Sequence, residues 1–123
     1  MTPNMKIEIE HSVVIESVEL LFVNHRELRL SGALATITAQ SAVERLLKDV
    51  HSHILTSKLR SFVVDVRLLK FVNSSALRLF INWISRAEAA GYTLVFVTDP
   101  GLTWHRLNFA VLKALSPQSV EIQ

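Results

Sequence analysis

Two adjacent serines, Ser74 and Ser75, stand where a strand-like apolar run gives way to a helix-like one in FVNSSALRLF, residues 71–80. A side-chain oxygen at such a junction can accept a hydrogen bond from an unpaired N–H group of the first helical turn. This capping bond stabilises a helix by about 1 kcal/mol. The same position can hold a small switch, because it lies at the positive end of the helix dipole. Composition and periodicity alone do not choose between a cap and a switch.

The sequence contains few residues that could form another catalytic site or a metal-binding site. The chain has no cysteine, which excludes disulfides, thiolate metal sites and a cysteine nucleophile. A glycine-rich phosphate loop cannot be built from three separated glycines, and no nucleophile-elbow motif occurs. His51 and His53 are two residues apart on a predicted helix, so they point about 200° apart and cannot chelate one ion. We predict no metal site and no cofactor, and we expect solvated or capping roles for the histidines, which are His11, His25, His51, His53 and His105.

One catalytic alternative stays open from chain order. Ser74 could act as the nucleophile of a small serine hydrolase if a histidine in a loop faced it, and His105 is the candidate base. Asp65 lies in the apolar run SFVVDV, and we expect this strand-end carboxylate to accept hydrogen bonds from nearby backbone N–H groups. We predict that the chain is not an enzyme.

Length, composition and charge limit the classes of protein to which the chain can belong. The 123 residues are half apolar and one-fifth charged, with a formal net charge of +2, which is typical of one globular domain. Lys and Arg are scattered, so no nucleic-acid footprint is predicted. The first residues do not form a secretory signal, and no apolar stretch approaches the roughly 20 residues of a membrane span. We therefore expect a soluble, cytoplasmic protein without membrane insertion.

The hydrophobic pattern changes from strand-like to helical along the chain. Residues 6–32 are rich in β-branched side chains and predict antiparallel strands, with NHRE as a turn and Gly32 closing the region. Residues 33–41 are expected to be a loop. From Ser41 an apolar stripe at helical spacing predicts a helix, which residues 58–61 connect to the strand SFVVDV. Both this strand and the strand YTLVFV, residues 92–97, are expected to be covered on both faces.

Two further helices follow from the same reasoning. One is predicted from Ser74 to a stop at Gly91, and the other over residues 103–115 with one aligned apolar stripe, consisting of Trp104, Leu107, Val111 and Leu115. A short final strand is predicted at SVEI, residues 119–122. The sequence therefore predicts one α/β domain over residues 1–123, with N-terminal strands in 6–32 and an α/β core in 41–123. We expect a mixed, mainly parallel sheet of about four to five strands with helices packed on it.

The segment VVDVRLLKFVNSSAL, residues 63–77, resembles the signature of STAS domains, the fold of the bacterial anti-sigma-factor antagonists. In that family an Asp ends a buried strand, and eight residues later an Asp-Ser-Ser-Gly-Leu motif opens a helix. Asp65 matches the first position, and Asn73 to Leu77 match the motif without a gap. LRLSGAL around Gly32 and AEAAGYTLVFV, residues 87–97, are similar to other family elements, so the resemblance extends from about Leu28 to the C-terminus.

The resemblance implies a function and a site. It implies a non-enzymatic regulator that binds a kinase-type anti-sigma factor, a serine protein kinase of the histidine-kinase-like ATPase type, and so controls transcription by partner switching. Ser74 matches the serine phosphorylated in antagonist members, and Asn73, Ser74, Ser75 and Ala76 form the switch motif. ATP would belong to the kinase. The alternative is a STAS module that is not phosphorylated, in a lipid-transport or signalling assembly; the oligomeric state, including a homo-oligomer, stays open.

Two residues depart from the family pattern, because Asn73 replaces its Asp and Ala76 replaces its Gly. Asn caps a helix about as well as Asp, but the negative charge beside the serine is lost. The helix itself carries a wide apolar arc, in which Leu79 and Trp83 extend the stripe that faces the sheet. This arc can be buried by a neighbouring helix. Alternatively, Leu79 and Trp83 form an exposed docking patch beside Ser74, and we predict them as partner-binding residues.

Overall fold

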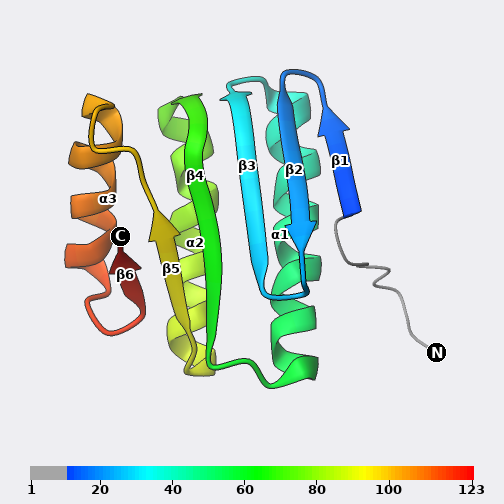
Figure 1. The fold of residues 1–123 in the computed structure, drawn as a ribbon, viewed down its shortest axis with the longest axis vertical. Coiled ribbons are helices and arrows are strands. Elements are labelled where there is room, and N and C mark those ends of the chain that lie inside the picture. The colour runs from blue at the N-terminus through cyan, green and yellow to red at the C-terminus, as the bar shows by residue number, and fades with distance from the viewer. Residues whose placement is uncertain (1–10) are drawn as a thin grey trace.

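The computed structural model describes residues 11–123 and contains one six-stranded sheet with three helices (Figure 1). The strands lie in chain order across the sheet, from β1 at one edge to β6 at the other. In chain order the elements are β1 (His11–Ile15), β2 (Val18–Val23), β3 (Glu27–Leu34), α1 (Ile37–Ser57), β4 (Ser61–Val72), α2 (Ser74–Ala90), β5 (Thr93–Val97), α3 (Thr103–Leu115) and β6 (Val120–Ile122).

The sheet is mixed and mostly parallel, as predicted. β1, β2 and β3 pair antiparallel, whereas β3–β4, β4–β5 and β5–β6 are parallel pairs joined through the helices. The described residues form six strands rather than four or five, because the N-terminal region supplies three strands. The part of the predicted N-terminal strands in residues 6–10 lies outside the described residues.

The predicted loop at residues 33–41 is wrong. β3 continues to Leu34, and α1 begins at Ile37. Gly32 explains the first difference: its φ is +96°, and a Cβ there would lie 2.0 Å from the Ser17 carbonyl oxygen, so only glycine lets the two backbones approach this closely. Thr36 explains the second, because its hydroxyl accepts a hydrogen bond from the Ala39 N–H group and caps the helix.

The helices cover one face of the sheet, so the prediction of strands covered on both faces is wrong. α1 and α2 lie behind the sheet in the view of Figure 1, and α3 lies at the β6 edge. In β4 the buried side chains of Phe62 and Val64 alternate with the half-buried Val63. An apolar residue on the open face can thus be shielded by its strand neighbours without a second helical layer. Aromatic contacts of Phe109 with Phe80 and Phe96 join α3 to the same core.

The predicted bounds of α3 are confirmed, but most of the apolar stripe that the sequence aligns is not on its buried side. Its buried side chains are His105, Phe109 and Leu112. Leu107, Val111 and Leu115, which helical spacing aligns with Trp104, are 62%, 55% and 61% exposed. Both sets have helical spacing, so periodicity cannot decide between them. The buried set is the one that contains the aromatic ring of Phe109. His105 can be buried with it because both ring nitrogens of His105 are hydrogen-bonded to the backbone.

Candidate functional site

The start of α2 is capped by Asn73 and not by Ser74 or Ser75. The side-chain oxygen of Asn73 accepts a hydrogen bond from the Ala76 N–H group at 2.9 Å, and its backbone carbonyl accepts one from Leu77. Asn73 has extended backbone angles, as an N-cap requires. The helix ends at Gly91, as predicted. Gly91 has a φ of +87°, and its backbone N–H group donates a hydrogen bond to the Ala87 carbonyl. The sequence thus places this helix accurately.

Asn73 also joins the start of α2 to the start of α1. Its side-chain amide donates to the Ala35 carbonyl at 2.9 Å, and Gln40 of α1 donates to its side-chain oxygen at 3.0 Å. The Asn73 N–H group is bonded to the Leu34 carbonyl at the end of β3. One side chain therefore uses both its donor and its acceptor to hold two chain segments side by side.

Ser74 and Ser75 are the first two residues of α2, and both are exposed. Asn73 satisfies the N–H groups of Ala76 and Leu77, so the N–H groups of Ser74 and Ser75 are those that the helix geometry leaves without an intrahelical acceptor. Their hydroxyls are therefore not needed as the cap. An anion on either hydroxyl would lie at the positive end of a 17-residue helix.

Two exposed apolar side chains lie on the segments that Asn73 joins. Ile37 begins α1 and is 82% exposed, and Phe71 near the end of β4 is 51% exposed. We call Ile37, Phe71, Ser74 and Ser75 the α2-start surface. Ile37 is not predicted from the sequence, because residues 33–41 are expected to form a loop. Extending the helical stripe back to Ala39 and taking Thr36 as a cap would have placed Ile37 at an exposed first position.

Ala76, Leu79 and Trp83 do not belong to this surface, which corrects the predicted contact residues. Ala76 and Trp83 are fully buried, and Leu79 is 8% exposed. The wide apolar arc of α2 packs against the sheet and against the neighbouring α1. Of the two alternatives left open by the sequence, burial of the arc is therefore the correct one. The burial of Trp83 is compatible with its polar group because its indole N–H donates to the Tyr92 hydroxyl at 3.0 Å.

The Tyr92 hydroxyl continues this hydrogen-bond chain to α1. It lies 2.6 Å from Nδ1 of His51. Burial, the largest effect, lowers the pKa of His51, and the charge of Arg86 lowers it further, so the neutral ring is favoured as the acceptor. Burial raises the pKa of Tyr92 to about 12. His51 is therefore part of the packing between α1 and the end of α2, and not the solvated or capping histidine that the sequence predicts.

Asp65 lies in the middle of β4, not at its end, because β4 continues for seven residues beyond it to Val72. The expected backbone hydrogen bond is confirmed: its carboxylate accepts from the Arg67 N–H group at 3.0 Å and from the Arg67 guanidinium at 2.7 Å. The strand carries an extra residue at this point, since Arg29 pairs with Asp65 but Ser31 pairs with Leu68. Burial raises the pKa of Asp65, but the hydrogen bonds and charges of Arg67 and Arg29 together lower it below its ordinary value.

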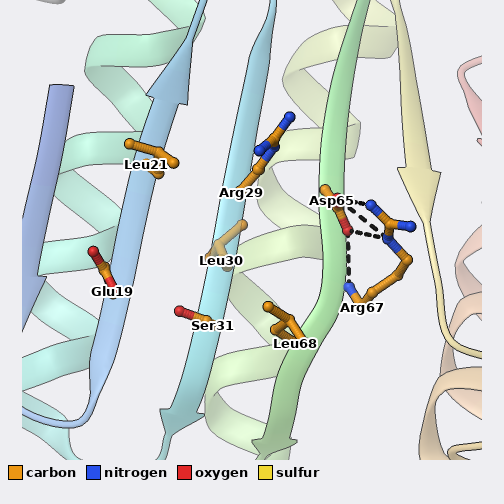
Figure 2. A pocket seen from close by; sticks show the side chains of 8 residues that line it. All are labelled: Glu19, Leu21, Arg29, Leu30, Ser31, Asp65, Arg67 and Leu68. Carbon is orange, nitrogen blue, oxygen red and sulfur yellow. Dashed lines mark hydrogen bonds and ion pairs between the residues drawn. The ribbon is translucent and has the colours of Figure 1, made fainter. Parts of the chain in front are cut away.

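A shallow hollow of about 420 Å³ lies beside this bulge on the open face of the sheet (Figure 2). It is lined by Glu19, Leu21, Arg29, Leu30, Ser31, Asp65, Arg67 and Leu68. Arg67 is bound to Asp65, and Arg29 is bound to Glu27 at 2.7 Å. Both guanidinium groups are therefore paired with carboxylates of this chain, whereas among the described residues the Glu19 carboxylate accepts a hydrogen bond from the Ser12 hydroxyl and not from a cation.

His105 cannot serve as the base of a serine hydrolase in this arrangement. It is fully buried, its Nδ1 accepts from the Asp99 N–H group at 3.0 Å, and its Nε2 lies 3.0 Å from the Leu69 carbonyl. Neither nitrogen is left to receive a proton from Ser74. Within residues 11–123, no group of three potential ligands could hold a metal ion, and no helix is long and apolar enough to cross a membrane.

Comparison with known families agrees with this geometry. The family model for the STAS domain matches residues 13–114, most of the chain. The chain belongs to the STAS family. The family resemblance and the α/β fold inferred from the sequence are thus confirmed, and the chain is an anti-sigma-factor antagonist-like or binding module of a generally non-enzymatic kind. STAS domains typically act by binding other proteins. No curated protein matches the sequence.

Proposed function

We propose that this STAS domain is an anti-sigma-factor antagonist-like partner switch that phosphorylation of Ser74 controls. Its partner would be a kinase-type anti-sigma factor, a serine kinase of the histidine-kinase-like ATPase type, in the cytoplasm. The unphosphorylated domain would bind the kinase through the α2-start surface and so regulate transcription. ATP would be bound by the kinase and not by this chain.

The observation that carries the proposal is the position of Ser74. It is exposed at the first position of α2, and Asn73 takes the capping role, so the hydroxyl of Ser74 is free for modification. Ile37 and Phe71 on the adjoining segments offer apolar contact area to a partner. Exposed apolar side chains around a polar group are typical of a protein-binding surface.

A phosphate on Ser74 would change binding without changing the fold. It adds a charge of about −1.5 to −2, which the helix dipole and the N–H groups of Ser74 and Ser75 tolerate in the free domain. In the complex, the same charge would have to be desolvated next to apolar contacts such as Phe71. Phosphorylation would therefore release the partner and leave the domain folded.

The test compares the wild type with Ser74→Ala and Ser74→Asp as baits in lysate of the source cells, with captured proteins identified by mass spectrometry. Ser52→Asp is the matched control, because Ser52 is exposed near the C-terminal end of α1 and the variant adds the same charge away from the start of α2. We expect the wild type, Ser74→Ala and Ser52→Asp to retain a kinase-type anti-sigma factor and Ser74→Asp to lose it. Circular dichroism should show Ser74→Asp folded.

A second pair of variants tests the surface separately from the switch. Phe71→Asp should lose the partner, whereas Leu55→Asp should keep it, because Leu55 is 47% exposed but lies near the other end of α1. If Ser74→Asp keeps the partner and Phe71→Asp loses it, Ser74 is not a switch and the domain is a constitutive binding module, such as a subunit of a lipid-transport or signalling assembly. If Phe71→Asp also keeps the partner, the α2-start surface is not the contact.

A further inference from the structure

Three polar side chains form a hydrogen-bond chain between α1 and the C-terminal end of α2. The indole N–H group of Trp83 on α2 donates to the Tyr92 hydroxyl at 3.0 Å, and this hydroxyl lies 2.6 Å from Nδ1 of His51 on α1. Trp83 and Tyr92 are buried, whereas His51 is half-buried. The rings of His51 and Tyr92 also pack together, with centroids 5.6 Å apart. We call these three residues the α1–α2 latch.

The donor and acceptor roles in the α1–α2 latch follow from the number of hydrogens. An indole N–H group can only donate, so the Tyr92 oxygen accepts from Trp83. The single hydrogen of the Tyr92 hydroxyl then needs an acceptor, and Nδ1 of His51 is its other hydrogen-bond partner among the described residues. Nδ1 can accept only in the neutral ring that carries its hydrogen on Nε2. The geometry therefore requires one protonation state and one tautomer of His51.

We propose that the α1–α2 latch is acid-sensitive and that protonation of His51 opens it. Protonation adds a hydrogen ion from water to Nδ1, which becomes a donor and can no longer accept from Tyr92. The Tyr92 hydroxyl then keeps its hydrogen without an acceptor at a buried position. Because a buried donor without a partner is unfavourable, the end of α2 and the turn to β5 separate from α1.

The charged surroundings of His51 also oppose its protonation. Burial, the largest effect, lowers the pKa of His51, and the positive charge of Arg86 on α2 lowers it further. On α1 itself, Lys48 lies one turn before His51, and its ammonium group is 3.9 Å from the Glu44 carboxylate. Burial raises the pKa of Tyr92 to about 12, so Tyr92 stays neutral in acid. Because the folded pKa of His51 is lowered, the latch contributes its full stability above the ordinary value of 6.5 and loses it as the pH falls through the folded pKa.

The other end of the helix pair has no such sensitivity. There Asn73 joins the start of α2 to the Ala35 carbonyl and to the side chain of Gln40, and none of these groups titrates. Acid therefore opens the contact between α1 and α2 at one end and leaves the α2-start surface in place. The inference does not rest on the proposed switch at Ser74, because the α1–α2 latch contains no residue of that surface.

Nuclear magnetic resonance of the side chains tests the latch directly. At about pH 7.5, above the ordinary pKa of histidine, nitrogen-15 signals should show His51 as the tautomer with hydrogen on Nε2. As the pH falls, the indole N–H signal of Trp83 should shift with the same midpoint as His51. In Tyr92→Phe the Trp83 signal should no longer follow His51, and the pKa of His51 should rise towards its ordinary value.

A neighbouring histidine provides the matched control. His53 also lies on α1, but its Nε2 is bonded to the His25 carbonyl at 3.0 Å. A carbonyl accepts from the charged ring as well as from the neutral ring, so the titration of His53 should be the same in the wild type and in Tyr92→Phe. The chain has two tryptophans, and Trp104→Phe removes the other indole signal and so assigns that of Trp83.

Amide hydrogen exchange measures the opening itself. The Tyr92 amide is bonded to the Ala87 carbonyl at 3.1 Å, and the Leu77 amide is bonded to the Asn73 carbonyl at 3.0 Å. After correction for the intrinsic rate, the Tyr92 amide should exchange severalfold faster at about pH 5 than at about pH 7.5, and the Leu77 amide should not change. Equal changes at the two amides would contradict a latch at one end of the helix pair.

Two results from the side-chain titration would overturn the proposal. One is a Trp83 signal that stays constant through the midpoint of His51 in the wild type. The other is a pKa of His51 that is the same in the wild type and in Tyr92→Phe. If circular dichroism shows that Tyr92→Phe does not fold, His51→Phe replaces it, since this variant keeps a ring but has no acceptor. Its Trp83 signal should stay constant over the same pH range, and a signal that still shifts would exclude His51 as the cause.

Discussion

The side-chain amide of Asn73 donates a hydrogen bond to the Ala35 carbonyl across 2.9 Å. An Asp at this position could accept the capping bond from Ala76 but could not donate to Ala35. The amide group therefore holds the β3–α1 connection against the start of α2. Asn73 is the residue at which this sequence departs from the family's Asp, and the tertiary contact gives a physical reason for the departure.

This contact predicts the ranking of two variants in urea unfolding. Asn73→Ala removes the cap and the bond to Ala35, and we expect it to lower the free energy of unfolding by about 2 kcal/mol. Asn73→Asp keeps the cap but places a carboxylate against a carbonyl. We expect a smaller loss of about 0.5–1 kcal/mol, because the helix dipole offsets part of the cost. An Asp variant more stable than the wild type would show that the Ala35 bond contributes nothing.

The two glycines with positive φ should differ in their tolerance of alanine. Gly91 has a φ of +87° and no atom within 4 Å of an added Cβ, so Gly91→Ala should cost about 1 kcal/mol of backbone strain. Gly32 has a similar φ, but the added Cβ would meet the Ser17 carbonyl oxygen at 2.0 Å. We expect Gly32→Ala to cost about 3 kcal/mol or more. Thermal or urea unfolding of both variants measures the difference, and equal losses would mean that β2 and β3 separate easily at this point.

Tyr92 should titrate well above an ordinary tyrosine. Its hydroxyl is buried between Trp83 and His51, and burial raises its pKa to about 12 from an ordinary value of 10.0. Because the folded pKa is raised, its contribution to stability is complete below pH 10 and is lost as the pH rises towards 12. The chain contains one tyrosine, so tyrosinate absorbance reports Tyr92 alone. We expect a midpoint near 12 in the folded protein and near 10 in guanidinium; a folded midpoint near 10, with circular dichroism unchanged, would show that the hydroxyl is open to water.

The sequence determined those parts of the fold that depend on local interactions. The start and end of α2 follow from the polar group of Asn73 and from Gly91, since capping and positive φ are properties of a few neighbouring residues. The family also follows from a short segment around Asp65 and Ser74. Gly32 is found from its type and position, although the reason for it, the approach of the Ser17 carbonyl, is a contact between strands.

The tertiary structure decided which of several apolar sets is buried. Trp83 and Leu79 are compatible with an exposed patch until the structure shows both buried, and Leu107, Val111 and Leu115 are compatible with a core until Phe109 occupies it. Helical periodicity defines a stripe but not what packs against it. Likewise, Ile37 and Phe71, which are 34 residues apart in the sequence, lie on two segments that only the structure shows to be joined. Asn73 joins these segments by binding the backbone at Ala35 and the side chain of Gln40, and contacts over such a separation leave no local signal in the sequence.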